Sequence, residues 1–242
     1  MAAEKQARSN CEMPAQDRHI VIAIDGPAAS GKSSVARELA GRLGFVHVNS
    51  GAMYRAVTWD ILRRGIDPRD HARIDNYLKR ARIVCDLQNN ESHILINDID
   101  AAQHLRDDNV NKSVSLVSSV PRVRQVLVEK MRRYARDYDL VMEGRDIGSV
   151  VFPDTPFKFY IDALPDVRLR RRAAEGQRDE IANRDHADSS RNASPLVIAK
   201  DAEVIDTSNL SIQGVVSEIA ARLQTKGLRI ASSREAGQRS RS

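Results

Sequence analysis

Short apolar runs alternate with longer segments of helical periodicity along most of this chain. The run Ile20–Ile24 predicts a buried strand of a parallel sheet, and Val35, Leu39 and Leu43 follow it at helical spacing. Further strands are predicted at 45–48, 140–142, 157–161 and 203–206, and further helices at 52–64, 121–136, from 166 onward and at 212–223. This alternation predicts an α/β fold, in which helices flank a parallel sheet on both faces and ligands bind at the carboxyl ends of the strands.

One segment breaks the alternation. Between about residues 74 and 106, two strand-like runs at 82–87 and 93–96 flank a polar turn at 88–92. A short polar turn between two strands is typical of a β-hairpin and not of a crossover through a helix. We therefore expect an insertion at about 66–110 that packs beside the main sheet.

Both ends of the chain are poor in large apolar residues. Residues 1–18 and the basic residues 229–242 are predicted to be disordered tails. One folded domain is then expected at 19–228.

The segment GPAASGKS at 26–33 joins the first strand to the first helix and matches the phosphate-loop pattern. Its glycines allow a tight turn, and the N–H groups at the helix start point towards an anion. Lys32 supplies a positive charge for the outer phosphates, and the Ser33 hydroxyl can hold Mg²⁺. The alternative is an ordinary strand–turn–helix with a chance Gly-Lys-Ser, which the flanking pattern disfavours. The predicted ATP-binding residues are Gly26, Pro27, Ala28, Ala29, Ser30, Gly31, Lys32, Ser33 and Ser34.

The composition narrows the setting in which the chain works. Of its 242 residues, 41% are hydrophobic and 29% are charged, and no apolar run approaches the length of a membrane span. The first 18 residues lack the apolar core of a signal peptide, so we expect a cytoplasmic protein without membrane attachment. Cys11 and Cys85 belong to no metal-binding or Cys-x-x-Cys spacing, which favours free thiols.

The net charge of +5 raises the question of a nucleic-acid partner. Aromatic residues that could stack on bases are largely absent among the basic ones. Arginines grouped near a phosphate loop also suit an enzyme that handles several phosphates. We therefore favour small phosphorylated ligands and expect no requirement for nucleic acid.

Two turns at predicted strand ends carry candidate chemistry. Ser50 could cap the following helix or bind an anion there, and Arg55, about one turn later, could hold a phosphate. Glu143 ends a buried strand, where an acidic residue can hold Mg²⁺ through water. Arg145 and Asp146 follow it on a glycine-flanked turn, which indicates a substrate-facing loop or a structural ion pair.

A third cluster is rich in arginine and extends from Arg168 to Arg191. Such a run is usually a solvated helix. Beside a phosphate loop, it can instead form a lid that closes over the transferring phosphoryl group.

These motifs resemble those of the bacterial cytidylate kinases, a family of the nucleoside monophosphate kinase superfamily. The similarity covers about residues 19–225, and its motifs occur in the family's order. They are IDGPAASGK ending at Lys32, SGAMYR at 50–55, PRVR at 121–124, residues 143–153, Arg184 with Asp188 and Arg191, ASPL at 193–196 and DTS at 206–208.

The resemblance implies a phosphate-loop kinase that transfers a phosphoryl group from ATP, with Mg²⁺, to CMP or dCMP. By analogy, the acceptor phosphate and its surroundings would be held by Ser50, Arg55, Arg145 and Arg191, the sugar by Arg184 and Asp188, and the cytosine by Ser115, Arg124 and Asp146. The catalytic residues would be Lys32, Arg145, Arg168 and Arg171, with Mg²⁺ on Ser33 and, through water, Glu143. The insertion would be the monophosphate-binding region and about 168–192 an arginine-rich lid. We expect a monomer.

The base assignment agrees with the chemistry of cytosine, which presents an amino donor beside ring and carbonyl acceptors. The carboxylate of Asp146 can accept from the amino group while Arg124 donates to the acceptors. Uracil reverses the donor pattern, so Asp146 would then face a carbonyl oxygen and be poorly paired.

Three features depart from the family pattern. Asn49 stands where the family usually has Asp, and Glu143 stands where Asp is frequent. The segment between Arg172 and Arg184 is also shorter than in many relatives.

Two other functions stay open at this point. A kinase of the same fold could use UMP, AMP or shikimate, and would differ chiefly at Ser115, Arg124 and Asp146. A nucleotide-binding switch with a basic tail would hydrolyse ATP slowly without an acceptor and would bind polynucleotides in a salt-sensitive way.

Overall fold

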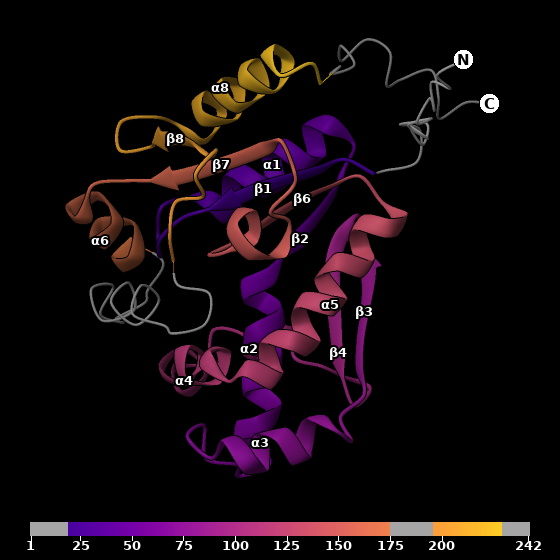
Figure 1. Cartoon of the computed structure of the whole chain (residues 1–242). Helices are drawn as coiled ribbons and strands as arrows, with labels where there is room; N and C mark the ends of the chain where they lie inside the picture. The colour runs from indigo at the N-terminus through magenta and orange to yellow at the C-terminus, as the bar shows by residue number, and fades with distance from the viewer. Residues whose placement is uncertain (1–18, 175–195, 229–242) are drawn as a thin grey trace, which may run out of the picture.

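The computed structural model describes residues 19–174 and 196–228. It confirms the α/β fold: an eight-stranded sheet has the order β3-β4-β2-β6-β1-β7-β8, with β5 paired to β4 (Figure 1). The strands are β1 Val21–Asp25, β2 Val46–Asn49, β3 Ile83–Gln88, β4 Glu91–Ile96, β5 Ile99–Asp100, β6 Leu140–Gly144, β7 Phe157–Asp162 and β8 Glu203–Asp206. The helices are α1 Lys32–Leu43, α2 Ser50–Arg63, α3 His71–Leu78, α4 Asp108–Ser119, α5 Pro121–Asp137, α6 Pro165–Ala174 and α8 Ile212–Thr225. A 3₁₀ turn covers Ala102–His104, and a π-helical turn covers Ile147–Val151.

The sheet is mixed rather than purely parallel. Strands β4, β2, β6, β1, β7 and β8 are parallel to one another, whereas β3 and β5 are antiparallel to β4. The predicted hairpin exists, but it does not simply pack beside the sheet. Its second strand pairs with β2 at His47 and Glu91, because the open edge of β2 offers unpaired backbone groups.

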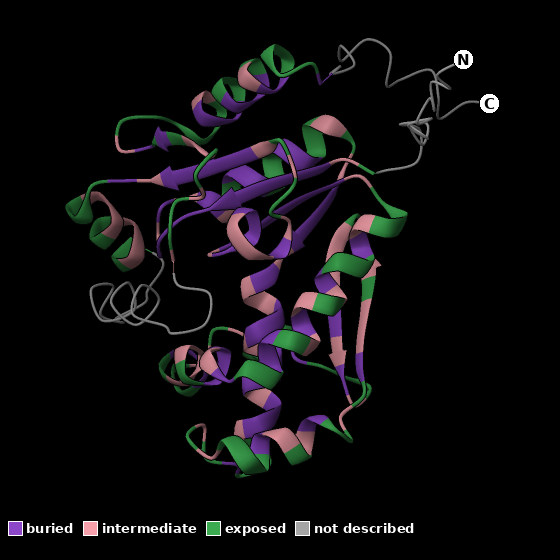
Figure 2. Cartoon of the chain, in the orientation of Figure 1, coloured by how far each residue is buried: buried purple, intermediate pink, exposed green. Residues whose placement is uncertain are grey.

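The two faces of the sheet bury separate cores, and the alternation of side chains along β1 shows why. Ile22 and Ile24 pack with α1 and α8, while Val21 and Ala23 pack with α2 and α5. Figure 2 shows the central strands buried along most of their length and exposed residues on the outer sides of α5 and α8. A strand that is covered on both faces must be apolar throughout, which explains the uninterrupted run at 20–24.

Two helices were not predicted from the sequence. Helix α3 is short and buries Ile74 and Leu78, and its N-cap Asp70 accepts a hydrogen bond from Arg73 N at 3.0 Å. Helix α4 is rich in Ser, Asn and Val, which are poor helix formers. Helix α4 packs against α2 and α5 and buries Val110 and Val117 completely, which overrides that propensity. The end of the predicted insertion, at residue 110, falls inside α4.

Parts of the predicted organisation lie outside the described residues. These are both tails, at 1–18 and 229–242, and most of the lid, since 175–195 are not described. Within the described ranges, no helix is long and apolar enough to cross a membrane.

Asp60 of α2 anchors the α3 and hairpin region. Its side chain is fully buried and accepts hydrogen bonds from Arg63, Arg64, Tyr77 and Asn97 at 2.6–3.1 Å. Burial by itself would raise the pKa of Asp60, but the bonds from Arg64, Arg63 and Tyr77 hold the pKa below its usual value. One carboxylate thus joins α2, α3 and the turn after β4.

We expect Asp60→Ala to lower the free energy of unfolding by about 2–3 kcal/mol, because it leaves the half-buried Tyr77 hydroxyl and Asn97 amide without their acceptor. Chemical denaturation at pH 7 measures this. Glu218→Ala is the matched control, since Glu218 also pairs with an arginine four residues later, on the exposed side of α8. The control should change stability by less than about 0.5 kcal/mol. Equal effects of the two substitutions would contradict the anchoring role of Asp60.

Candidate active site

The phosphate loop leaves β1 at the centre of the sheet. Gly26 is required there by close packing, because a Cβ at this position would lie 2.0 Å from the carbonyl oxygen of Ile161. Helix α1 begins at Lys32, and its N-cap Gly31 provides no side-chain cap. Uncapped N–H groups at a helix start form an anion-binding site. Lys32 is buried, and its Nζ donates to the carbonyl oxygen of Pro27 at 3.0 Å.

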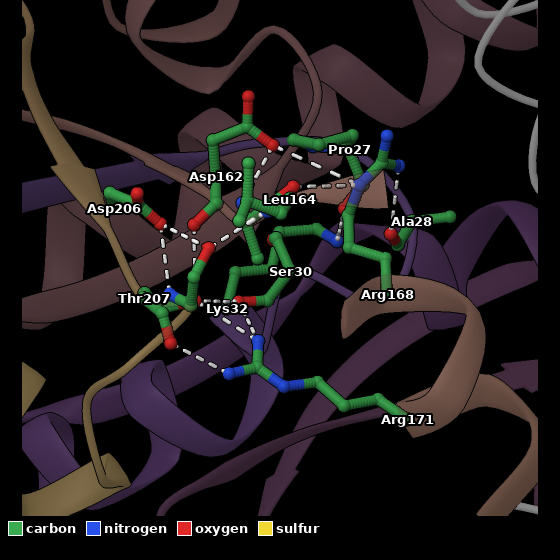
Figure 3. Close-up of polar contacts among 12 residues, drawn as sticks. Pro27, Ala28, Ser30, Lys32, Asp162, Leu164, Arg168, Arg171, Asp206 and Thr207 are labelled. Carbon is green, nitrogen blue, oxygen red and sulfur yellow. Dashed lines mark hydrogen bonds and ion pairs between the residues drawn. The ribbon is translucent and has the colours of Figure 1, made fainter. Parts of the chain in front are cut away.

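Two arginines of α6 contact this loop, as Figure 3 shows. Arg168 donates to the carbonyl oxygen of Ala28 at 3.3 Å, and Arg171 donates to that of Ser30 at 3.2 Å. The guanidinium of Arg171 also donates to both oxygens of Thr207, at 3.0 and 2.7 Å. The structure therefore brings the phosphate loop together with two of the three arginines that the sequence analysis selected as catalytic, Arg168 and Arg171.

Thr207, the residue after β8, links the phosphate loop to the end of β7. Its hydroxyl lies 2.9 Å from the Ser30 carbonyl oxygen and 3.0 Å from that of Asp162, while its N–H donates to Asp162 O at 2.8 Å. Asp162 ends β7, and Asp206 ends β8. The loops after β1, β7 and β8 thus lie together at the carboxyl edge of the sheet, beside the phosphate loop.

The start of α2 corrects one part of the sequence analysis. Asn49, and not Ser50, caps this helix: Asn49 Oδ1 accepts from Ala52 N at 2.9 Å. Ser50 is buried, and its hydroxyl donates to the carbonyl oxygen of Glu143 at 2.7 Å. The residue that departs from the family pattern therefore has a structural role, because Asn caps a helix about as well as Asp.

Arg55 lies at the same helix end. A Cβ on Gly51 would be 2.9 Å from Arg55 Nη1 and 3.3 Å from Asn49 Oδ1, so the Arg55 guanidinium folds back over the first turn of α2. Positive charge beside the N-terminal end of a helix favours an anion there. That Arg55 holds the acceptor phosphate stays a prediction.

Arg124 and Asp146, predicted to recognise the base, form a buried ion pair between α5 and the turn after β6. The Arg124 guanidinium also donates to the Ser118 carbonyl oxygen at 3.3 Å and lies 5.5 Å from the centre of the Tyr54 ring. Ser115, half-buried on α4, accepts through its carbonyl oxygen from the Ser118 hydroxyl at 3.1 Å. Ser118 thus joins Ser115 to the ion pair.

The turn that carries Arg145 and Asp146 begins where β6 ends. Arg145 is half-buried, Asp146 is buried, and the π-helical turn 147–151 follows them. Asp25, the last residue of β1, accepts hydrogen bonds from Ile147 N at 2.8 Å and Gly148 N at 2.7 Å. Burial raises the pKa of Asp25 to about 6, although these two bonds act to lower it.

Ser33 and Glu143 are the predicted ligands and water partners of a metal ion. Glu143 is buried at the end of β6, and its Oε1 has no hydrogen-bond partner among the described residues. A hydroxyl and a carboxylate are the oxygen donors that suit Mg²⁺. His47 lies near Glu143 on the α1 side of the sheet, and burial lowers the pKa of His47, which favours its neutral form.

Three predicted acceptor residues, Arg184, Asp188 and Arg191, lie outside the described residues. Three others were not given a role from the sequence: Asp25, Tyr54 and Thr207. Tyr54 and Thr207 lie inside the matching runs, so their position in those motifs was the available signal. Asp25 also lies inside a matching run, IDGPAASGK, but that motif gives no sign of its contact with residues 147 and 148.

Comparisons with known proteins identify the family of the chain. The family model described as Cytidylate kinase matches residues 22–225. The chain is 40% identical over 221 residues to a cytidylate kinase of Caldanaerobacter subterraneus subsp. tengcongensis, covering 86% of this chain and 97% of the relative. It is 41% identical over 212 residues to the cytidylate kinase of Mycobacterium leprae, covering 83% and 93%. For the Pelotomaculum thermopropionicum cytidylate kinase the identity is 42% over 215 residues, covering 84% and 95%. The chain belongs to the cytidylate kinase family.

Proposed function

We propose that the chain transfers the γ-phosphoryl group of ATP to CMP or dCMP, giving ADP and CDP or dCDP. The observation that carries this proposal is the buried Arg124–Asp146 pair on the turn after β6, the strand next to β1 and its phosphate loop. Such a pair offers one acceptor and several donors to the edge of a base, as cytosine requires. The family membership supports the same reaction.

The donor nucleotide would bind at the phosphate loop. Its phosphates would accept hydrogen bonds from the uncapped N–H groups at the start of α1, with Lys32 on the outer phosphates. Arg168 and Arg171 already contact this loop. Each would exchange a neutral carbonyl acceptor for a charged phosphate oxygen, which is the stronger partner.

Mg²⁺ is part of the proposal because Ser33 and the unpartnered carboxylate oxygen of Glu143 fit it. Ser33 would hold the ion directly, and Glu143 would hold its water. When bound, the ion neutralises charge on the donor phosphates.

The acceptor would bind across the start of α2 and the turn after β6. Arg55 and Arg145 would hold its phosphate, with Ser50 at the helix end. Ser115, Arg124 and Asp146 would read the base. Residues 184, 188 and 191 would complete the sugar and phosphate contacts, and the region at 66–110 would enclose the monophosphate.

The chemistry is an in-line displacement in which an oxygen of the acceptor phosphate attacks the γ-phosphorus. That oxygen is already ionised at neutral pH, so no strong general base is needed. Positioning of the two substrates and stabilisation of charge by Lys32, Arg145, Arg168 and Arg171 would supply the catalysis. Closure of the arginine-rich lid at 168–192 would exclude water and so limit hydrolysis of ATP.

We propose an active monomer that needs only ATP and CMP or dCMP, with no nucleic acid. A cytoplasmic location belongs to the same proposal, since ATP and nucleoside monophosphates are supplied there.

A coupled assay of ADP release with ATP and Mg²⁺ tests the reaction directly. We expect kcat/KM for CMP and dCMP to exceed that for UMP and AMP by about 10²-fold or more, because a mismatched base leaves buried polar groups unpaired. Comparable turnover with UMP or AMP would keep the kinase fold but contradict the base assignment. ADP release that no acceptor accelerates would instead favour the nucleotide-binding switch.

A further inference from the structure

The side chain of Asp25 connects the two substrate sites. Its backbone leads directly into Gly26 of the phosphate loop, and its two carboxylate oxygens bind the N–H groups of Ile147 and Gly148. Asp25 is 5% exposed, so water does not compete effectively for these bonds. The main chain of Asp25 is therefore continuous with the phosphate loop, and its side chain holds the turn after β6, which carries Arg145 and Asp146.

The residues that Asp25 brackets are those proposed to hold the acceptor. In the sheet, Asp25 pairs in register with Gly144. Its carboxylate then binds the turn again at Ile147, at 2.8 Å. Arg145 and Asp146 are the two residues between these attachment points. Their backbone is held at both ends by the same residue of β1.

The opposite end of the π-helical turn is also fixed. Arg132 of α5 donates to the carbonyl oxygens of Val151 at 2.9 Å and Val150 at 3.0 Å. The carboxylate thus satisfies the N–H end of the turn and the guanidinium satisfies its carbonyl end, which is the favourable order for the peptide dipoles. π-helical turns are rare and are frequent at functional sites.

We propose that Asp25 is a positioning residue, which fixes Arg145 and Asp146 relative to the phosphate loop and so aligns the acceptor with the γ-phosphoryl group. This inference rests on the proposed function. Asp25 touches neither substrate in this assignment. Its effect comes through the two N–H groups it holds, and an error of about 1 Å in such an alignment costs on the order of 10²-fold in rate.

Asp25→Asn tests the inference, since it preserves size and removes one acceptor. The amide oxygen can still accept one N–H, but the amide nitrogen must face the other donor. We expect kcat with CMP to fall by about 10²-fold and the preference for CMP over UMP to fall by about 10-fold. Slow ATP hydrolysis without acceptor and KM for ATP should stay within about three-fold, because the phosphate loop keeps its own contacts.

Asp139→Asn is the matched control. The Asp139 carboxylate also binds a backbone N–H beside β1, that of Ile20 at 2.6 Å, but at the opposite end of the strand. This control should retain both kcat and base preference.

If wild-type protein shows no CMP-dependent turnover, the proposed function fails. If the wild type is active and Asp25→Asn keeps its kcat and its base preference, the role of Asp25 alone is wrong. If Asp25→Asn loses ATP hydrolysis without acceptor as strongly as it loses kcat with CMP, the defect lies in the phosphate loop, and the positioning role of Asp25 is also wrong.

The pH dependence of the thermal midpoint gives a second readout. The pKa of Asp25 rises from 3.8 to about 6 in the folded protein. Its contribution to stability is therefore largest below pH 3.8 and declines as pH rises to about 6. We expect the difference in midpoint between wild type and Asp25→Asn to change over this interval and to be constant above it. A constant difference at every pH would contradict a buried ionisable carboxylate at this position. The charged groups facing it are Asp146 and Arg145 on the turn and Lys158 of β7, whose stem packs against Gly148.

Arg132→Gln provides an independent variant should Asp25→Asn fold poorly. It releases the carbonyl end of the turn from the exposed face of α5. A smaller fall in base preference, without a change in acceptor-independent hydrolysis, is expected. An unchanged preference for CMP over UMP in this variant would contradict the view that the clamped turn sets acceptor alignment.

Discussion

Lys32→Met should lower kcat with CMP by about 10³-fold while leaving the fold intact, because a charge that acts on the transferring phosphoryl group is worth this much. Lys32 is the first residue of α1, and its Nζ lies 3.0 Å from the carbonyl oxygen of Pro27, within the phosphate loop. Methionine keeps most of the apolar stem of lysine and removes the charge together with the hydrogen bond to the Pro27 carbonyl oxygen. Steady-state kinetics with saturating ATP and CMP, together with circular dichroism, measure the two effects.

Lys158→Met is the matched control for this experiment. Lys158 is similarly buried and also donates to a proline carbonyl five residues earlier, that of Pro153, but its charge pairs with Asp201 in the turn before β8. We expect it to lower stability and to leave kcat within about five-fold of wild type. Similar losses of kcat in the two variants would show that burial of the amine, rather than its place beside the phosphates, accounts for the effect.

Asp146→Asn should reduce the ratio of kcat/KM for CMP to that for UMP by about 10²-fold. The carboxylate can only accept hydrogen bonds, which matches the amino group of cytosine, whereas an amide can also donate to the carbonyl oxygen of uracil. The loss of charge also weakens the buried pair with Arg124. Most of the change should therefore come from lower activity with CMP, and part from higher relative activity with UMP.

Asp201→Asn serves as the control, because it removes the carboxylate of another ion pair with a buried cation, that with Lys158. Its selectivity should equal that of the wild type. An unaltered CMP to UMP ratio in Asp146→Asn would remove Asp146 from base recognition and would direct attention to Ser115 and Arg124 alone. Measuring Asp146→Ala in parallel separates loss of the acceptor from gain of the amide donor.

The parallel strands were the most predictable part of the fold. The uninterrupted apolar run at 20–24 and the phosphate-loop motif after it are local patterns, and each reports directly on burial or on backbone conformation. Helix α4 was not predictable in this way. Its Ser, Asn and Val residues favour other conformations, and only packing against α2 and α5 makes it a helix.

The site shows the same division. Five residues selected from motifs lie at two places in the structure. The phosphate loop brings together Lys32, Arg168 and Arg171, and one ion pair joins Arg124 to Asp146. Ser50 was proposed as a possible helix cap, whereas Asn49 has that role. A one-residue error of this kind is expected, because Ser and Asn are both good caps and the sequence does not fix where the first turn begins.

The sequence by itself determined the phosphate loop, the α/β class and the family, since all three depend on residue types at short spacing. The tertiary structure alone decided that the hairpin extends the sheet, that Thr207 joins the phosphate loop to the end of β7, and that Asp25 holds the turn after β6. Those contacts join residues far apart in the chain: Asp25 and Ile147, for example, are separated by 122 positions. No local pattern encodes such a pair, because a buried carboxylate and its N–H partners meet only when β1 and β6 lie side by side in the folded sheet.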